Sequence, residues 1–306
     1  MNAAGLKPKL HSLKVHIKTL QLAAFAIQET HAEIKGTFDG KFEDHHTFEA
    51  IRKSKRKGGT LVGVHKSLNP VLIREYSEDF ELLVVQIKVN KTQIRIISGY
   101  GPQETWLEPL RSPFFIALDA EFEKASLAGI QILNAMDANT KLGNKWIIRD
   151  KHPPCDNAKL LVPIIQRHCL TVGNGHVNAK GVITRKRVLT NSTQESTIDL
   201  VLLSSQLGKC IKEIVIDEDQ DNGLYRITKT KTGTVTKKSD HNPIITELAI
   251  PWQNKSKEDK IEIWNFKSRE CQKRFKEHTT EGTYLTSALE GNEHITERTG
   301  FFFKKV

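Results

Sequence analysis

The sequence predicts an α/β protein, because helical and strand-like hydrophobic patterns alternate along its 306 residues. Apolar residues recur at helical spacing in three segments, 9–21, 109–127 and about 156–169. Short, almost continuous apolar runs lie between and after these segments, as is typical of buried strands. The runs are 23–27, 60–65, 82–89, 93–98, 130–136, 196–203, 211–216 and 244–250. A chain of this length fits one large α/β domain.

The first half of the chain supplies helices and a hairpin. An amphipathic stripe from Leu10 to Leu20 predicts the first helix, with basic residues between its apolar positions. The runs 82–89 and 93–98 are separated by only three residues, which predicts an antiparallel hairpin. Pro113 predicts a broken start for the helix at 109–127.

The amino-acid composition changes near the end of the second half of the chain. Asp156 lies where the N-cap of the third helix is expected. Residues 217–238 are first acidic and then rich in Lys and Thr, which indicates a long loop or hairpin. We expect a folded domain over 1–252 and a charged, linker-like extension over 253–306.

The charge balance favours a polyanionic partner. The formal net charge is +10, which suits nucleic acid or an anionic membrane surface, although a basic balance also serves solubility alone. Two basic runs contribute, one at Arg52 and Lys53 and one at Arg185, Lys186 and Arg187. Such runs are often solvated loops, and a surface that follows phosphates is the sharper interpretation.

The remaining composition bears on the compartment. The four cysteines are scattered and form no C-x-x-C pair, so a reducing compartment fits. The apolar run at 22–27 is too short to span a bilayer, and no signal peptide precedes it. We therefore expect a nuclear or cytoplasmic protein that is neither secreted nor embedded in a membrane.

Polar residues of a particular kind follow or lie within the apolar runs. They are Glu29, Tyr100, Asp137, Asn139, Asp199, Asp240 and His241. An Asp inside an apolar strand, as at position 199, is costly unless it is paired. Converging at one rim of a sandwich, such residues would suit phosphodiester hydrolysis, which needs a hard cation, an activated water and a cation near the phosphate.

Five short motifs, in order, resemble the endonuclease/exonuclease/phosphatase family. They are Gln28-Glu29-Thr30, Tyr100-x-Pro102, Asp137-x-Asn139, Ser196-x-Ile198-Asp199 and Ser239-Asp240-His241. Asn2 resembles the Asn in the first of the family's motifs. The residues in and around these motifs are most similar to those of the endonuclease of LINE-type (non-LTR) retrotransposons. The resemblance covers about residues 1–250. It implies a four-layer α/β sandwich, with two mostly antiparallel sheets packed together and flanked by helices.

The resemblance implies a metal site and a DNA substrate. Glu29 would be the main ligand of Mg²⁺, with Mn²⁺ as a substitute, and Asn2 and Asp240 would lie near the metal. The partner would be double-stranded target DNA, contacted by Arg52, Lys53, Arg185, Lys186 and Arg187, with residues 184–195 influencing the choice of target. The products would carry a 3′-hydroxyl and a 5′-phosphate, and the 3′-hydroxyl would prime reverse transcription.

The resemblance also implies catalytic roles. Asp137 would activate or orient the attacking water, and Asn139 would help to fix it. His241, hydrogen-bonded to Asp199, would stabilise the pentacovalent phosphate. Tyr100 would donate a hydrogen bond to a phosphate oxygen.

Three departures from the family pattern stand out. Met136 occupies a position where the family has Gly, and its side chain is expected to crowd the metal rim. The family has a full strand before the opening Asn, whereas this sequence starts at Met1-Asn2, so we expect a truncated first strand. No acidic motif of a reverse transcriptase follows, although Trp264-Asn265-Phe266 resembles the linker that leads to one.

Two alternatives remain open. One is a phosphatase or phosphodiesterase of the same fold that acts on a lipid or inositol phosphate, against which counts the lack of an apolar membrane-docking loop. The other is a retroelement remnant that binds nucleic acid without catalysis.

Overall fold

The larger of the two central sheets has six strands and supports the rest of the chain. The structure, a computed structural model, describes residues 1–52, 58–230 and 233–250. In spatial order the strands of this sheet are β4 (Val71–Tyr76), β5 (Glu81–Val89), β6 (Thr92–Tyr100), β7 (Gln131–Asp137), β12 (Asp199–Leu203) and β8 (Thr171–Val172). All neighbours pair antiparallel except β6 and β7, which are parallel.

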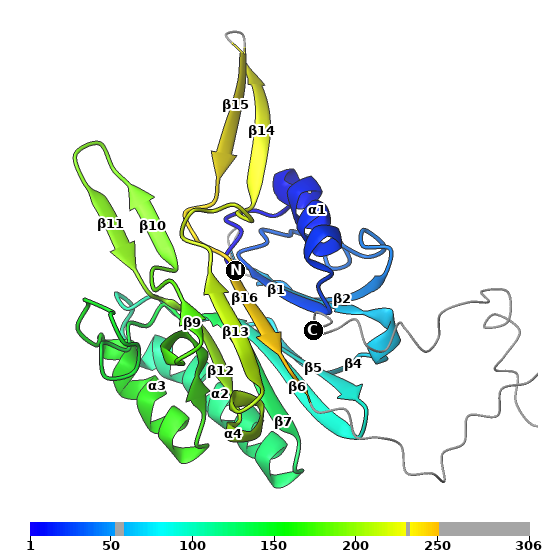
Figure 1. Cartoon of the computed structure of the whole chain (residues 1–306), viewed down its shortest axis with the longest axis vertical. Helices are drawn as coiled ribbons and strands as arrows, with labels where there is room; N and C mark the ends of the chain where they lie inside the picture. Colours follow the sequence, from blue (N-terminus) through cyan, green and yellow to red (C-terminus); the bar gives the residue numbers. More distant parts are fainter. Residues whose placement is uncertain (53–57, 231–232, 251–306) are drawn as a thin grey trace, which may run out of the picture. The chain divides into compact units, whose positions relative to one another are not determined.

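Two three-stranded sheets form the second layer (Figure 1). One contains β1 (Ala24–Gln28), β3 (Thr60–His65) and β2 (His45–Ala50), and the other contains β16 (Ile244–Leu248), β13 (Ile211–Ile216) and β9 (Ala179–Lys180). The helices are α1 (Leu10–Leu20), α2 (Glu108–Leu127), α3 (Asp156–Arg167) and α4 (Ser205–Gly208), with 3₁₀ turns at Lys7–Lys9, Lys66–Leu68 and Gly173–Gly175.

Strand alternation divides the core into layers. In β5, Leu82 and Val84 pack toward α2 and α3, whereas Leu83 and Val85 pack toward the second layer of strands. This is the period of two that a strand buried on both faces must show. Helix α1 packs on the outer side of β1 and β3 through a third cluster that includes Leu13. The layers therefore follow the order helix, sheet, sheet, helix, as expected for the four-layer sandwich.

Two hairpins extend from the end of the sheets where β7 finishes (Figure 1). One is formed by β10 (Arg185–Val188) and β11 (Thr193–Ser196), and the other by β14 (Tyr225–Thr230) and β15 (Gly233–Lys238). The second hairpin confirms one of the two expectations for 217–238. Among the described residues, no helix has both the length and the apolar character needed to cross a membrane.

The helices and the long apolar strands lie where the patterns predict them, and the differences have local causes. Helix α2 continues through Pro113 because a buried stripe that includes Phe114 and Phe122 holds it against the sheet. The apolar run 196–203 is divided between β11 and β12, and the Thr184 hydroxyl accepts hydrogen bonds from the backbone of residues 198 and 199 at the break. The expected extension at 253–306 lies outside the described residues.

The N-terminal residues enter the second layer between its two halves. Asn2 forms a single parallel bridge with Gln28, and the Met1 ammonium donates to the Ala26 carbonyl at 2.9 Å. Burial lowers the pKa of this amino group, against the opposing charges of Asp199 and Asp137. Of the opening strand expected for the fold, the structure holds this one bridge.

An apolar groove of about 180 Å³ continues in line with Met1. The edge strands β1 and β16 form its walls, residues of α1 such as Leu13 cover it, and Leu133 and Val201 of the large sheet form its floor. Ala24 and Ile244 on the two walls are half-buried. The groove therefore lies between two unpaired strand edges, where a further strand could pair.

Filling this groove is expected to stabilise the protein. Fusing Gly-Val-Ile-Val-Leu before Met1 adds a strand parallel to β1 and replaces the buried ammonium with an amide. Each kcal/mol gained should raise the Tm by about 2–4 °C. The matched fusion Gly-Asp-Pro-Asp-Ser, which cannot pair or bury apolar surface, should leave the Tm unchanged or lower it. Equal melting curves for the two fusions would contradict this role of the groove.

Candidate active site

The pairing of three strands places three site residues in a row. Asp199 on β12 stands opposite Asp137 on β7, and Asp137 stands beside Tyr100 on β6. Directly opposite residues of neighbouring strands have Cβ atoms about 5 Å apart. The register of the sheet thus brings together residues that are up to 99 positions apart in the sequence, from 100 to 199.

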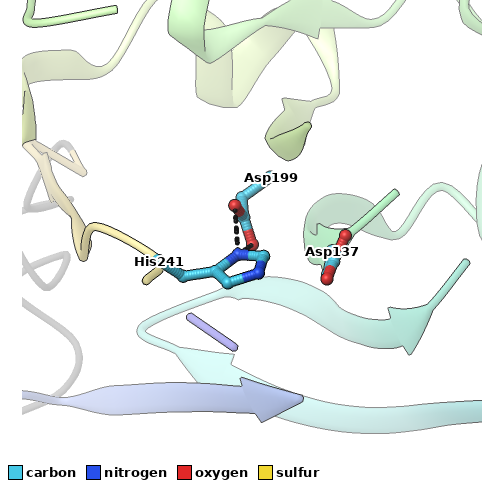
Figure 2. A group of neighbouring side chains, drawn as sticks. All are labelled: Asp137, Asp199 and His241. Carbon is cyan, nitrogen blue, oxygen red and sulfur yellow. Dashed lines mark hydrogen bonds and ion pairs between the residues drawn. The ribbon is translucent and has the colours of Figure 1, made fainter. Parts of the chain in front are cut away.

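His241 bonds to the first residue of this row. Its Nδ1 lies 2.9 Å and 3.1 Å from the two carboxylate oxygens of Asp199, and both side chains are buried. Burial alone would lower the pKa of His241, but the charge and hydrogen bond of Asp199, followed by the charges of Asp137 and Asp240, raise it to about 9. The imidazole is therefore a cation at neutral pH. Figure 2 shows the other ring nitrogen on the side that faces Asp137.

Asp137 is held as a buried carboxylate. Its Oδ2 accepts a hydrogen bond from the Asn2 side-chain amide at 2.9 Å, and its Oδ1 accepts one from the Asn139 backbone at 3.0 Å. Burial, and then the charge of Asp199, raise the pKa of Asp137 to about 6 against the effects of His241 and these two donors. At neutral pH the group is ionised, and it is a stronger base than an ordinary aspartate.

Asn139 takes a left-handed backbone conformation, with φ of +45°. Its side-chain amide donates to the Gly101 carbonyl at 2.8 Å. Asn157 of α3 completes this loop pair, since it donates to the carbonyls of Pro102 and Asn139 and accepts from Arg111. Sequence analysis missed Asn157, because an amide in the first turn of a helix carries no pattern that separates it from a surface residue.

Glu29 lies beside this row at the end of β1, also in a left-handed conformation with φ of +50°. Burial would raise its pKa, but hydrogen bonds with His31, Tyr100 and Asn2 lower it to about 2. Burial, followed by the charges of Glu29 and Asp137, raises the pKa of Tyr100, so its hydroxyl stays protonated as a donor. His31, whose ring lies 3.5 Å from the Glu29 carboxylate, is a second neighbour that the sequence did not single out.

The donor set fits a hard divalent cation near Glu29. Glu29, Asp137 and Asp199 supply three carboxylates, against which stands the one imidazolium of His241. Such an excess of buried negative charge favours a cation, and carboxylate oxygens are the ligands that Mg²⁺ prefers. Ligand atoms of Asp137, Asp199 and His241 also lie within 4.8 Å of one another. That trio is a poor metal site, because a metal needs the neutral form of histidine.

Asp240, which is expected near the metal, lies beside a basic residue. Its carboxylate lies 3.2 Å from Arg185 Nε, and both side chains are about one-third exposed. The backbone of β10 is tied to the same segment, by a bridge between Arg185 and His241 and by the Lys186 amide, which donates to the Asp240 carbonyl. The basic strand and the triplet that contains His241 are thus one structural unit.

A cleft of about 1100 Å³ lies next to these residues, and Glu29, Asp240 and His241 contribute to its lining. One wall is β10 with Arg185, Lys186 and Arg187. The site residues expected at strand ends therefore converge, and the basic run at 185–187 lies next to them.

Arg52 does not lie on this surface, which corrects its expected role as a contact for nucleic acid. It is 7% exposed and pairs with Glu81, which is fully buried. Its guanidinium lies 5.9 Å from the centre of the Tyr100 ring, so the pair supports the site from within. Lys53 lies outside the described residues.

Met136 does not crowd the metal rim, in contrast to the expectation. Because side chains alternate along β7, Met136 points into the core under α2 and α3 and is 2% exposed, while Asp137 points elsewhere.

The comparisons with known proteins bear on the fold. No protein-family model and no curated protein matches the chain. Among solved structures, the endonuclease domain of TRAS1, a telomere-specific non-LTR retrotransposon, is 16% identical with a TM-score of 0.55, and the match covers 82% of this chain and 96% of that one. The AP endonuclease LMAP from Leishmania major is 15% identical with a TM-score of 0.61, covering 82% and 86%.

A sugar phosphatase is also similar. The mannosyl-6-phosphatase Bt3783 from Bacteroides thetaiotaomicron is 11% identical with a TM-score of 0.57, covering 81% of this chain and 92% of that one. The protein has the endonuclease/exonuclease/phosphatase fold. This confirms the fold that the ordered motifs implied.

Breaking the pair under Tyr100 is expected to destabilise the endonuclease/exonuclease/phosphatase fold strongly. Glu81→Ala leaves the buried guanidinium of Arg52 uncompensated, which should cost about 3–5 kcal/mol in chemical denaturation. Glu75→Ala, which removes the partner of the exposed Lys35, should cost less than about 1 kcal/mol. The double variant Arg52→Met with Glu81→Leu should regain most of the loss. If Glu81→Ala and Glu75→Ala lower the free energy of unfolding by similar amounts, the buried pair contributes no more to stability than the exposed one.

Proposed function

We propose that the protein is a metal-dependent phosphodiester hydrolase that nicks double-stranded DNA, as the endonuclease of a LINE-type retroelement. The observation that carries the proposal is the row of Asp137 and Asp199 with the His241 imidazolium, next to a cleft that Glu29, His241 and the basic residues 185–187 line. The products would be a 3′-hydroxyl, available to prime reverse transcription, and a 5′-phosphate.

Asp137 is suited to accept a proton from the attacking water. Its pKa of about 6 makes it ionised at neutral pH and more basic than a solvent-exposed aspartate. Hydrogen bonds from Asn2 and Asn139 fix the orientation of its carboxylate. A fixed base next to the phosphate keeps the water in line for attack without the entropy cost of collecting it from solution.

His241 is suited to stabilise the charge that grows on the phosphate. Asp199 fixes the ring through Nδ1 and keeps it protonated. The other ring nitrogen can then donate to a phosphate oxygen as the pentacovalent state forms. Tyr100, whose hydroxyl stays protonated, adds a second donor.

Glu29, with Asn2 and Asp240, would hold Mg²⁺ or Mn²⁺. When bound, such an ion supplies positive charge to the phosphate oxygens and to the leaving oxygen. Asp240 is free to turn from Arg185 toward the ion because the contact is about one-third exposed and therefore weak.

DNA is the substrate that the cleft favours. Three consecutive basic residues on β10 line the cleft next to the site, where they can follow a phosphate backbone. The TRAS1 domain supports this choice because its fold is shared over 82% of the chain. The phosphatase Bt3783 keeps a second candidate open, a phosphatase acting on a small phosphate ester. Release of phosphate from an inositol polyphosphate, without nicking of DNA, would favour that candidate.

Removing the base is expected to abolish nicking. Asp137→Asn keeps the shape and the hydrogen bond with the Asn139 backbone but cannot accept the proton, so nicking of supercoiled plasmid with Mg²⁺ should fall roughly 10²–10⁴-fold. His241→Ala should lose activity as well, since the charge on the phosphate is then uncompensated. The exposed Asp39→Asn serves as the matched control and should nick like the wild type. Equal nicking by all four proteins would mean that a contaminating nuclease is being measured.

Removing the principal metal ligand is expected to change the metal requirement. Glu29→Gln should need a much higher Mg²⁺ concentration for half-maximal nicking, because a neutral amide binds a hard cation less well than a carboxylate. EDTA should stop nicking by the wild type, and added Mg²⁺ or Mn²⁺ should restore it. Glu33→Gln, an exposed carboxylate close in sequence, should keep the wild-type Mg²⁺ titration curve. A Mg²⁺ curve of Glu29→Gln that overlies the wild type would exclude Glu29 as the ligand.

A further inference from the structure

The hairpin β14–β15 carries positive charge that the site described above does not use. Residues 225–238 contain five basic residues and no acidic one. Arg226 and Lys238 are exposed and line the large cleft. Within the part of the chain that the structure describes, Arg226 has no ion-pair partner.

The composition of this hairpin leaves its positive charge without an acidic partner in the same hairpin. Arg226 is exposed, and residues 225–238 contain no Asp or Glu. The hairpin β10–β11 differs, since Lys186 lies 3.1 Å from Glu195, its opposite residue. An external anion is therefore the natural counter-charge for β14–β15.

The position of the hairpin gives that anion a place. Arg226 and Lys238 line the same cleft as Arg185 and Arg187 but come from a different hairpin, and His241 also lines this cleft. In Figure 1, β10–β11 and β14–β15 project from the same end of the sheets as two separate arms. A polyanion lying across the cleft would meet a basic strand from each arm.

The base of the hairpin is rigidly held. The Tyr225 amide donates to the Ser12 hydroxyl at 3.2 Å, and the Ser239 amide donates to the buried Leu224 carbonyl at 2.8 Å. Gln220 donates to the Ser239 carbonyl at 2.9 Å and receives a hydrogen bond from Lys238 at its own carbonyl. The arm is thus fixed relative to the triplet that it directly precedes, so its charge is presented at a defined distance from the site.

We propose that β14–β15 is a second nucleic-acid-binding arm, which holds the phosphate backbone of duplex DNA on the side of the cleft away from β10–β11. The inference rests on the proposed function for the choice of polyanion. When both hairpins bind, they contact the duplex on two sides of the scissile phosphate. Arg226 is placed to contact a phosphate, whereas the ammonium of Lys238, which also lines the cleft, donates to the Gln220 carbonyl.

The test is the salt dependence of binding to a 30-base-pair duplex in EDTA, where no cleavage occurs. Each phosphate contact contributes about −0.9 to the slope of log K against log salt concentration. Arg226→Gln should weaken binding at low salt and make the slope shallower by about 0.9. The exposed Lys88→Gln at the far end of β5 removes the same charge and should leave the slope unchanged.

A second variant removes the whole arm. Tyr225 and Lys238 are opposite residues, so replacing 226–237 with Asn-Gly closes a two-residue turn between them. This variant should have a shallower slope than Arg226→Gln and an unchanged Tm. If Arg226→Gln and the shortened variant both keep the wild-type slope, the arm does not bind DNA and the inference is wrong.

The outcome is distinguishable from failure of the proposed function. A protein that binds duplex DNA through Arg226 but never nicks it with Mg²⁺ would overturn the nuclease and keep the arm. If the protein nicks DNA with Mg²⁺ but the salt dependence of binding is the same with and without Arg226 and the hairpin, the proposed nuclease function stands and the proposed binding arm is wrong.

Discussion

The juxtaposition of Asp137 and Asp199 in adjacent strands is the constraint on which the site depends. Two buried carboxylates at opposite positions repel each other, and the sheet tolerates them only because each has its own compensation. Asp199 has the His241 imidazolium, and Asp137 has the Asn2 amide and the Asn139 backbone. Burial, followed by the charge of Asp199, raises the pKa of Asp137 to about 6. The burial and the charge that make the pair costly to fold therefore also make Asp137 more basic than an ordinary aspartate.

The supports of this pair extend through the second layer. The Thr184 hydroxyl accepts a hydrogen bond from the Asp199 backbone amide, and the Asn174 side-chain amide donates one to the Asp199 carbonyl. The Ser239 hydroxyl donates to the Asn2 carbonyl, which ties the segment before His241 to the segment that reaches Asp137. Few groups at the centre of the site depend on a single hydrogen bond for their orientation, and a site held this way keeps reacting groups in place.

Much of the fold was predictable because long apolar runs and helical stripes dominate it. Strands β5, β6, β7, β12 and β13 contain the longest apolar runs, and the burial of these runs leaves few alternatives. Strand β2, with the sequence His-His-Thr-Phe-Glu-Ala, and the exposed edge strand β4 were missed because their residues match no buried pattern. That a buried Asp199 needs a partner, most simply a His or an Arg, was predictable from the cost of burial, and His241 was the candidate that a phosphodiester-hydrolysing site and the resemblance both favoured.

Other features of the site depend on tertiary contacts that no local pattern encodes. Arg52 looks like the start of a basic surface run until Glu81, 29 residues away, is seen to bury it. Asp240 looks like a free ligand until Arg185 is seen beside it. In each case the partner lies on a different strand, so the charge of the residue was predictable and its environment was not.

The hydrogen bond between Ser239 and Asn2 has a consequence for the timing of synthesis. The site needs residues from the first positions of the chain and from position 241. The contact between Asn2 and Ser239 therefore joins residues that are separated by almost the whole sequence of the domain. Contacts of such sequence separation form late, because the loop between their ends must be ordered first. While the chain is still being made, its N-terminal segment has neither Asp199 nor His241 to meet. A nascent chain therefore has no assembled site until the segment that contains His241 has left the ribosome.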